Sequence, residues 1–224
     1  SLLKPTYFMQ STHNTISSMI AIYTKTHGYN ITYAHKGISF DSAVYDTLTQ
    51  IQLKKINNAL IGAHDELTPS YFSLLKRINY MGVEGMNVCS ETAMSAIIST
   101  EISNSNLCEI STMKMMYKPS IERIKQKVAE ILLENNMKQE DIDAVMIGVN
   151  GNKTNDEFYY NVTKELFKDT PLLHYKHIFG ENYTSSALGF YAASCCLTHR
   201  EIPSCSFLNK DSNLENPRNI FLLN

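Results

Sequence analysis

The sequence predicts an α/β protein in which helices cover a largely parallel sheet. Apolar runs of strand length alternate along the chain with segments whose apolar residues recur at helical spacing. Several of these runs have the composition of strands buried inside a covered sheet. A strand that ends in a polar turn and feeds a helix is expected twice, at residues 31–37 and 144–152. Two related βαβ halves are therefore expected.

The N-terminal part predicts a helix, a short strand and a second helix. Residues 13–26 have four apolar side chains at helical spacing, and "GYNITYAH" at 28–35 has the pattern of a strand. Ser39 is a suitable N-cap for a helix over residues 40–56. One face of that helix is apolar and consists of Phe40, Ala43, Val44, Leu48 and Ile51.

The middle of the chain predicts three strands and one helix. Residues 58–66 have the pattern of a buried strand that leaves into a polar loop, and a helix over 69–78 has proline in its first turn. Two more strand-like runs, 91–102 and 108–117, flank the polar "SNSN" at 103–106. This polar run predicts a hairpin turn or a mobile connection.

The C-terminal part alternates between helices and strands. Residues 119–136 form the clearest amphipathic helix, with Ile124 and Val128 in its apolar stripe. A buried strand within 141–152 then enters a loop rich in glycine and asparagine. The remaining expected elements are a helix at 155–167, a strand at 171–180, a helix at 184–199 and a strand at 219–224.

Composition excludes several classes of protein. The chain has 224 residues, of which 43% are hydrophobic, so it can bury a large core in one or two domains. Its net charge is −2, from 20 basic and 22 acidic residues, and no basic run suggests nucleic-acid binding. The longest apolar stretches are about ten residues, whereas a membrane-spanning helix needs roughly 20. No membrane span is expected.

The cysteines and the N-terminus favour a cytoplasmic protein. An odd number of cysteines without CxxC spacing predicts buried free thiols rather than a disulfide framework or a zinc site. Free thiols fit a reducing compartment, and no signal peptide is visible. The stretch that follows Ser1 has the pattern of the interior of a domain, so an N-terminal truncation is expected. No cofactor is expected, and no metal at "HDE" (64–66), because adjacent side chains of an extended segment point to opposite faces.

Five stretches, in order, resemble the β-ketoacyl synthases of the thiolase-like superfamily. "YAHKG" at 33–37 lies where that family has its nucleophile turn, and residues 59–78 are similar to its strand with a "GG-D-E" pattern. Residues 89–99 resemble the "GEGA" strand. "AVMIGVNGNKTND" at 144–156 lies where the family has its "HGT-T" loop, and residues 174–197 resemble the segment around "GH-x-x-A-A-G".

The opening residues 5–22 and 29–43 look closer to one branch, the synthase-like proteins of bacterial aryl polyene or flexirubin pathways. The resemblance implies a thiolase-like layered fold of two related βαβ halves, with the N-terminal half truncated. Residues 1–105 would be the remnant of the N-terminal half, including the nucleophile turn. Residues 106–224 would be the C-terminal half.

The family catalyses a decarboxylative condensation on acyl chains held by an acyl carrier protein. A cysteine thiolate takes the acyl chain, two histidines assist decarboxylation and bind the enolate oxygen, and a lysine supports the site. Here the resemblance places His35 at the cysteine position, Asn150 and Glu181 at the histidine positions, and Lys176 at the lysine position. Thr154 lies where loop threonines of the family contact the pantetheine arm of the carrier.

These substitutions favour a synthase fold without synthase chemistry. An imidazole at residue 35 does not give the stable thioester-type carrier that condensation needs, and an ionised Glu181 would repel malonate and enolate. Losing one oxyanion donor typically costs ~10²–10³ in rate. Each residue also has a structural alternative: His35 and Asn150 as polar turn residues, and Lys176 in an ion pair with Glu181. Residues 206–223 lack the glycine-rich turn that the family has near its C-terminus.

Three functions remain open. The first is a non-condensing subunit of fatty acid or polyketide-type biosynthesis, in a homodimer or a heterodimer with an active ketosynthase. It would shape the cavity for a growing chain, as chain length factors do. The second is an active acyl-ACP condensing or acyltransfer enzyme with an atypical site around His35. The third is a module kept only for dimerisation, with "YNITYAH" (29–35) at the dimer edge.

Overall fold

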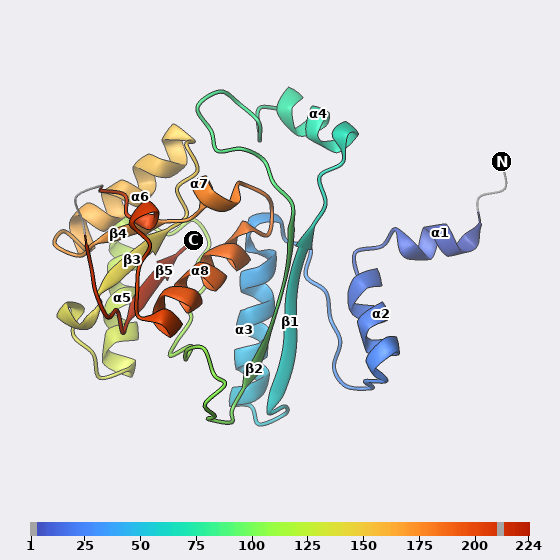
Figure 1. Ribbon diagram of the computed structural model, residues 1–224, viewed down its shortest axis with the longest axis horizontal. Coiled ribbons are helices and arrows are strands. Elements are labelled where there is room, and N and C mark those ends of the chain that lie inside the picture. Colours follow the sequence, from blue (N-terminus) through green and yellow to red (C-terminus); the bar gives the residue numbers. More distant parts are fainter. Residues whose placement is uncertain (1–3, 210–212) are drawn as a thin grey trace.

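The computed structural model describes residues 4–209 and 213–224 (Figure 1). The start at Ser1 and part of the glycine-free segment 206–223 therefore lie outside the described residues. From α3 to β4, α-helices and strands alternate, as predicted. The elements are α1 (Pro5–Gln10), α2 (Thr15–Thr24), a short 3₁₀ helix η1 (Lys36–Ile38), α3 (Ser39–Gln52), β1 (Asn58–Asp65), α4 (Pro69–Arg77), β2 (Thr92–Ser99), α5 (Ile121–Glu134), β3 (Ala144–Ile147), α6 (Lys153–Leu166), β4 (Leu172–His174), α7 (Lys176–Phe179), α8 (Ser185–His199) and β5 (Ile220–Leu223).

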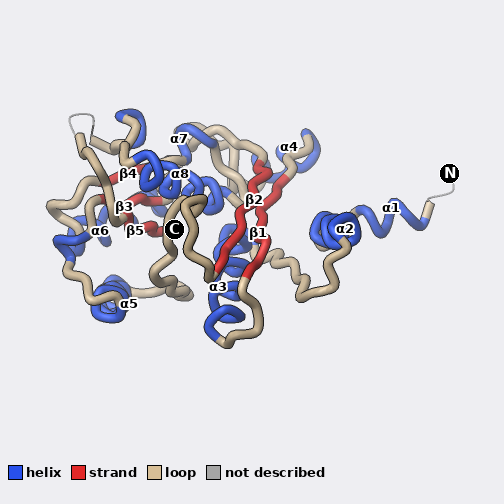
Figure 2. The backbone as a smooth tube through the Cα atoms, turned by 60° about the horizontal axis from the view of Figure 1, so that its bottom comes forward, coloured by secondary structure: helices blue, strands red, loops and turns tan. Residues whose placement is uncertain are grey.

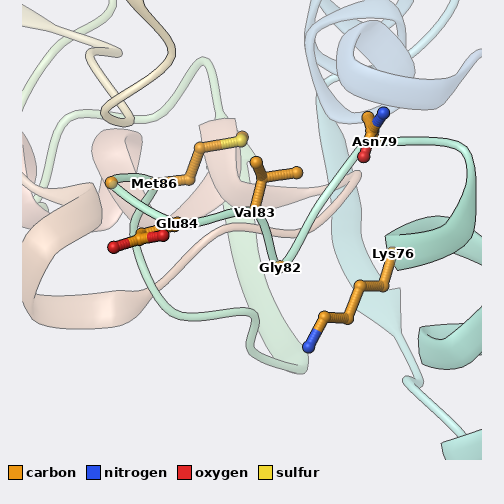
Figure 3. A pocket seen from close by; sticks show the side chains of 7 residues that line it. Lys76, Asn79, Gly82, Val83, Glu84 and Met86 are labelled. Carbon is orange, nitrogen blue, oxygen red and sulfur yellow. The ribbon is translucent and has the colours of Figure 1, made fainter.

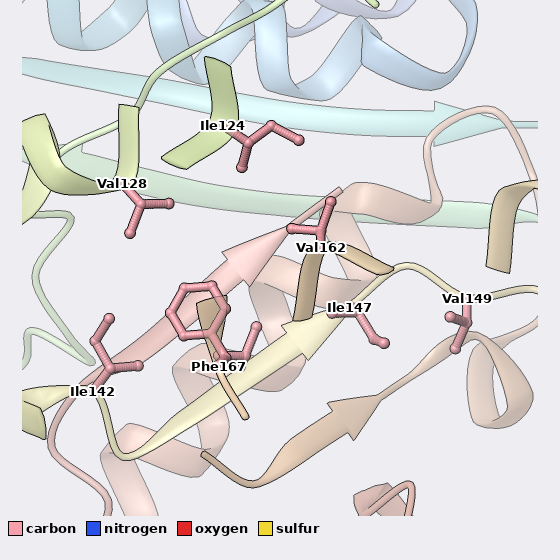
Figure 4. Close-up of a cluster of buried hydrophobic side chains, with 8 residues drawn as sticks. Ile124, Val128, Ile142, Ile147, Val149, Val162 and Phe167 are labelled. Atoms are coloured by element: carbon pink, nitrogen blue, oxygen red, sulfur yellow. The ribbon is translucent and has the colours of Figure 1, made fainter. Parts of the chain in front are cut away.

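The C-terminal part contains the predicted parallel sheet, with strand order β4-β3-β5. Every residue of the central strand β3 is buried, because helices cover both faces of the sheet. Val145 and Ile147 point to the face covered by α5 and α6, where they pack in a cluster with Val128 and Phe167 (Figure 4). The side chains of Ala144 and Met146 point to the opposite face of the sheet, which α8 covers. Full burial of such side chains contributes roughly 1.5–3 kcal/mol each.

The second sheet is an antiparallel ribbon of β1 and β2, so the sheets are only partly parallel. Its inner face packs against α3 and α8, where Phe40, Val44 and Ile61 are buried. The outer face carries the cross-strand pair Leu60 and Ile97, whose exposed fractions are 56% and 74%. The prediction of a buried strand at 58–66 was therefore wrong for one of its two faces. The ribbon lacks a covering layer on that side among the described residues (Figure 2).

Helix α8 lies between the two sheets, which explains its small side chains. Ala187 packs with α3 and β1, whereas Ala193 and Cys196 pack against the parallel sheet. Gly189 faces the ring of Tyr175, and a Cβ atom there would approach ring carbons to 2.7 Å. The prediction of a tightly packed helix at 184–199 is confirmed.

Three predicted strands are absent or shortened, because a strand requires a backbone partner. Residues 28–35 form no strand, and side chains tie the segment to α2 instead, including a 2.8 Å contact between the hydroxyls of Ser17 and Thr32. Residues 108–117 form part of an irregular connection from β2 to α5, where Cys108 contacts Ser194 of α8 and Thr112 accepts a hydrogen bond from Asn135 after α5. Within residues 171–180, β4 pairs with β3, and the following residues form the helix α7 instead of continuing the strand.

One of the two predicted helix-start signals is confirmed. Proline occupies the first turn of α4, as predicted, and Thr68 is the N-cap of that helix. Ser39 is the first residue of α3 rather than its N-cap, since η1 already forms the preceding turn. The Ser39 hydroxyl instead accepts a 2.8 Å hydrogen bond from the backbone amide of His35. All five cysteines are free thiols, as predicted, although only Cys196 is fully buried.

Residues 4–34, here called the N-terminal arm, extend away from both sheets (Figures 1 and 2). Neither α1 nor α2 contains a buried residue. Their large apolar side chains are exposed: Tyr7, Phe8, Met9, Ile16, Met19, Ile20, Ile22 and Tyr23. Across residues 4–209 and 213–224, no helix has the length and apolar character required to cross a membrane.

Candidate functional site

The candidate site lies at the carboxyl edge of the parallel sheet, where ligand sites of open α/β sheets are usually found. Asn150 follows the end of β3 by three residues, and Lys176 follows the end of β4 by two. Glu181 comes directly after the short helix α7 and Gly180. Three residues predicted from the resemblance are thus brought together.

The Glu181 carboxylate is the centre of this cluster. Its Oε2 atom accepts hydrogen bonds from Asn150 Nδ2 at 2.7 Å and from Lys176 Nζ at 2.9 Å. Its Oε1 atom accepts from the Ser185 hydroxyl, at the start of α8, at 2.9 Å. The Lys176 and Glu181 side chains are only 14% and 9% exposed. The alternative of an ion pair between Lys176 and Glu181 is therefore confirmed.

Backbone contacts hold Glu181 against the loop that precedes β2. Its amide donates to the Val88 carbonyl at 2.8 Å, and its carbonyl accepts from the Ser90 amide at 3.0 Å. The same loop reaches Asn150, whose carbonyl accepts from the Asn87 amide at 2.8 Å. A single loop therefore fixes the backbones of both Asn150 and Glu181.

Asn150 also orders its own loop, which confirms the alternative of a turn residue that satisfies backbone amides. Its Oδ1 atom accepts from the Asn152 amide at 3.0 Å, and its own amide donates to Asp156 at 2.9 Å. Asn152 in turn caps α6 by accepting from the amides of Thr154 and Asn155. Thr154 itself is exposed on the first turn of α6, away from the buried carboxylate cluster.

The structure does not bring His35 into this cluster. Its ring is exposed, with Nδ1 3.3 Å from the Ser42 hydroxyl and an edge-on contact to the Tyr33 ring at 5.7 Å between centroids. Within the described residues, it makes no hydrogen bond to Asn150, Lys176 or Glu181. His35, which the resemblance places at the position of the family's cysteine, is therefore not part of the hydrogen-bonded cluster of Asn150, Lys176 and Glu181.

Asp41 lies within electrostatic range of Lys176 and was missed in the sequence, although no hydrogen bond links its side chain to the cluster within the described residues. Burial raises the pKa of its carboxyl, while the neighbouring Ser186 hydroxyl and the Lys176 charge lower it. Burial likewise raises the pKa of the Tyr159 phenol, and the charges of Glu181 and Asp41 raise it further. Two carboxyl groups thus lie near one lysine. The signal was present, since Asp41 lies seven residues before Leu48, on the apolar side of its helix.

Replacing Asp41 with asparagine should stabilise the fold at neutral pH by about 1 kcal/mol. The folded pKa of Asp41 is raised, so its favourable contribution is present below the unfolded value of 3.8 and is lost as pH rises through the folded pKa. The gain from Asp41→Asn should therefore grow between pH 4 and pH 7.5 in urea unfolding followed by circular dichroism. Asp169→Asn, at an exposed position, is the control and should show no such trend.

A shallow pocket of about 550 Å³ lies next to the site (Figure 3). Its wall is the end of α4 and the following loop, and Figure 3 shows Lys76 and Glu84 on it. The same loop packs closely against the turn at Asn150. A Cβ atom at Gly151 would lie 2.2 Å from the Gly85 carbonyl oxygen. Gly151 has a φ of +87°, so both its conformation and its surroundings require glycine.

Chemically, the cluster can hold a carboxylate but offers little for nucleophilic attack. Three donors already occupy both carboxylate oxygens of Glu181. Cys89, which bridges to the Glu181 backbone, is a possible substitute nucleophile. Burial and the Glu181 charge raise the pKa of its thiol, so the thiolate is disfavoured.

No protein-family model and no curated protein matches the chain by sequence. Solved structures do match it in three dimensions. The ishigamide ketosynthase/chain length factor is 16% identical with a TM-score of 0.71, and the match covers 98% of this chain and 60% of that one. A ketosynthase in complex with its chain length factor from Xenorhabdus doucetiae is 14% identical with a TM-score of 0.70, covering 95% and 58%.

A third match is a type II polyketide synthase acyl carrier protein in complex with its ketosynthase, bound to the hexaketide. It is 10% identical with a TM-score of 0.69, and the match covers 99% of this chain and 62% of that one. The chain thus spans 58–62% of the length of these three structures. At such low identity, the similarity establishes architecture rather than activity. The chain has the thiolase-like α/β fold of ketosynthases and chain length factors.

Proposed function

We propose that the chain is a ketosynthase-like subunit that does not condense acyl groups and that pairs with an active ketosynthase, as a chain length factor does. The observation that carries this proposal is the state of Glu181. A buried carboxylate with three donors occupies a position where the resembled family has a histidine. The resembled nucleophile position holds the exposed imidazole of His35.

The electrostatics support the absence of condensation. A developing enolate oxygen needs donors with free hydrogen-bonding capacity. Here Asn150 Nδ2 and Lys176 Nζ already donate to Glu181, whose negative charge would oppose an enolate. Removing one oxyanion donor typically costs ~10²–10³ in rate, and a fixed negative charge adds to that cost.

Two of the structural matches support the choice of partners. One of those ketosynthases is in complex with its chain length factor, and another is in complex with its acyl carrier protein. We propose the same classes of partner for this chain: an active ketosynthase, and a carrier protein near Thr154. The aryl polyene or flexirubin pathway, and a boundary between the halves at residues 105 and 106, are part of the same proposal.

The N-terminal arm supplies the surface for the ketosynthase partner. It carries exposed apolar side chains on both of its helices and has no acidic residue. Exposed apolar surface of this extent is typical of a protein interface. The third alternative, a module that only dimerises, uses the same surface. It is distinguished by the absence of any effect on the length of the partner's product.

The double variant Met19→Glu/Tyr23→Glu should abolish partner binding without destabilising the chain. The two side chains lie one turn apart on α2 and are 58% and 90% exposed, so the isolated chain should tolerate charge there. Co-expression with a ketosynthase of the same organism, followed by affinity purification, should show at least a tenfold loss of complex. Leu133→Glu, on the exposed face of α5, is the matched control and should leave the complex intact. Equal recovery of both variants would contradict this assignment of the interface.

The activity alternative is tested with acyl- and malonyl-loaded carrier proteins. The isolated chain should release no carbon dioxide and elongate no acyl chain. Release of carbon dioxide, or acyl transfer, that disappears in His35→Ala would favour the atypical enzyme instead. Carbon dioxide release that persists in His35→Ala would place the activity elsewhere in the chain.

A further inference from the structure

Glu181 is bound in the way that a protein binds a small carboxylate ligand. Both carboxylate oxygens are engaged, by a lysine ammonium, an amide and a hydroxyl, at 2.7–2.9 Å. The donors come from three separate places in the fold: the loop after β3, the start of α7 and the start of α8. Ammonium and hydroxyl donors that converge on a buried carboxylate form charge-assisted bonds, the stronger class of hydrogen bond.

Contacts that do not involve the Glu181 side chain fix two of these donors, Asn150 and Ser185. The amide of Asn150 is oriented through its Oδ1 atom, which accepts from Asn152, and its backbone is held by Asp156. Ser185 is the first residue of the 15-residue helix α8. The partial positive charge of that helix end also favours an anion. Asn150 and Ser185 should therefore stay in place when the Glu181 carboxylate is removed, whereas the hydrogen-bond partner of Lys176 Nζ within the described residues is Glu181 itself.

We propose that Asn150, Lys176 and Ser185 form a binding site for the carboxylate of a small organic acid, and that Glu181 occupies it as an internal ligand. Once the Glu181 side chain is truncated, a small carboxylate would take its place on these three donors without any covalent step. Acetate has the appropriate size, because truncating glutamate to alanine removes one methylene and one carboxylate. This inference goes beyond the partner role and does not depend on it.

The charge balance of the cluster fits one bound carboxylate. Lys176 supplies one positive charge, and Asp41 is the second carboxyl close to it. Burial raises the pKa of Asp41, which favours its neutral form and limits repulsion of the ligand.

The test is thermal unfolding of Glu181→Ala in sodium acetate, sodium formate and sodium chloride at equal pH and ionic strength. Glu181→Ala should melt well below the wild type in chloride, and acetate should raise its melting temperature by several degrees in a saturable manner. The wild type and Glu181→Gln, whose sites remain filled, should melt alike in acetate and chloride. Lys176→Met/Glu181→Ala should lose the acetate response.

Two results would overturn the proposal. One is an acetate response of Glu181→Ala no larger than that of the wild type, and the other is a response that survives in the double variant. If Glu181→Ala does not fold in chloride, recovery of a cooperative transition in acetate supports the site, and failure in both salts rejects it. Pull-down of the ketosynthase by the wild-type chain tests the partner role separately, so the two proposals can fail independently.

Discussion

Lys176→Met is expected to lower the free energy of unfolding by about 3–5 kcal/mol at neutral pH. The substitution keeps an unbranched side chain, one atom shorter, but removes the positive charge that Glu181 Oε2 contacts at 2.9 Å. Glu181 would remain buried with only Asn150 and Ser185 as partners, and Asp41 would lose its neighbouring cation. The chain has no tryptophan, so urea unfolding followed by circular dichroism is the suitable measurement.

Two controls separate the buried charge from a general effect of losing a lysine. Lys176→Met/Glu181→Gln removes both charges and should recover most of the lost stability, because neither ion is then left without its partner. Lys114→Met removes a surface pair with Glu134, whose side chain is 47% exposed, and should cost less than about 1 kcal/mol. A Lys176→Met variant as stable as Lys114→Met would show that the Glu181 cluster is not held by charge.

Gly180→Ala is expected to be the second severe substitution. Gly180 has φ +82° and ψ −175°, a region that is essentially restricted to glycine. A Cβ atom there would lie 2.6 Å from Ser90 Cβ and 2.8 Å from the Val88 carbonyl oxygen. Backbone strain and overpacking together should cost about 3–5 kcal/mol and should displace Glu181, the next residue.

Gly37→Ala is the matched glycine control for this experiment. No atom lies within 4 Å of a Cβ built at Gly37, and its φ is not positive, so its stability should change by less than about 1 kcal/mol. Gly180→Ala/Ser90→Gly should recover the part of the loss due to the clash with Ser90, but not the parts due to the Val88 carbonyl oxygen and to φ. Midpoints of urea unfolding for the four proteins would separate the two contributions. A Gly180→Ala variant that matches Gly37→Ala would rule out a required glycine conformation at this turn.

Part of the candidate site was accessible from the sequence. Asn150, Lys176 and Glu181 were identified through a resemblance spread over most of the chain, and the structure brings these three together. Ser185 and Asp41 were not identified, although Ser185 donates to Glu181 and Asp41 lies within electrostatic range of Lys176. Ser185 appeared only as a small residue at the start of a packed helix. A hydroxyl in that position acquires a role only when the loop after α7 places Glu181 beside it.

The sequence by itself determined the helices α2–α6 and α8, where β1, β2, β3 and β5 run, and that β3 is buried, because apolar periodicity and capping residues act over a few neighbouring positions. It did not indicate α1, and it predicted a strand where α7 forms. Tertiary structure decided which strands pair. Residues 28–35 and 108–117 have strand-like composition, but no backbone partner lies beside them within the described chain. Tertiary structure also decided that His35 stays outside the hydrogen-bonded cluster while Asp41 lies close to it. The reason is physical: strand pairing and buried charge networks join residues far apart in the chain, so their free energy depends on contacts that no local pattern contains.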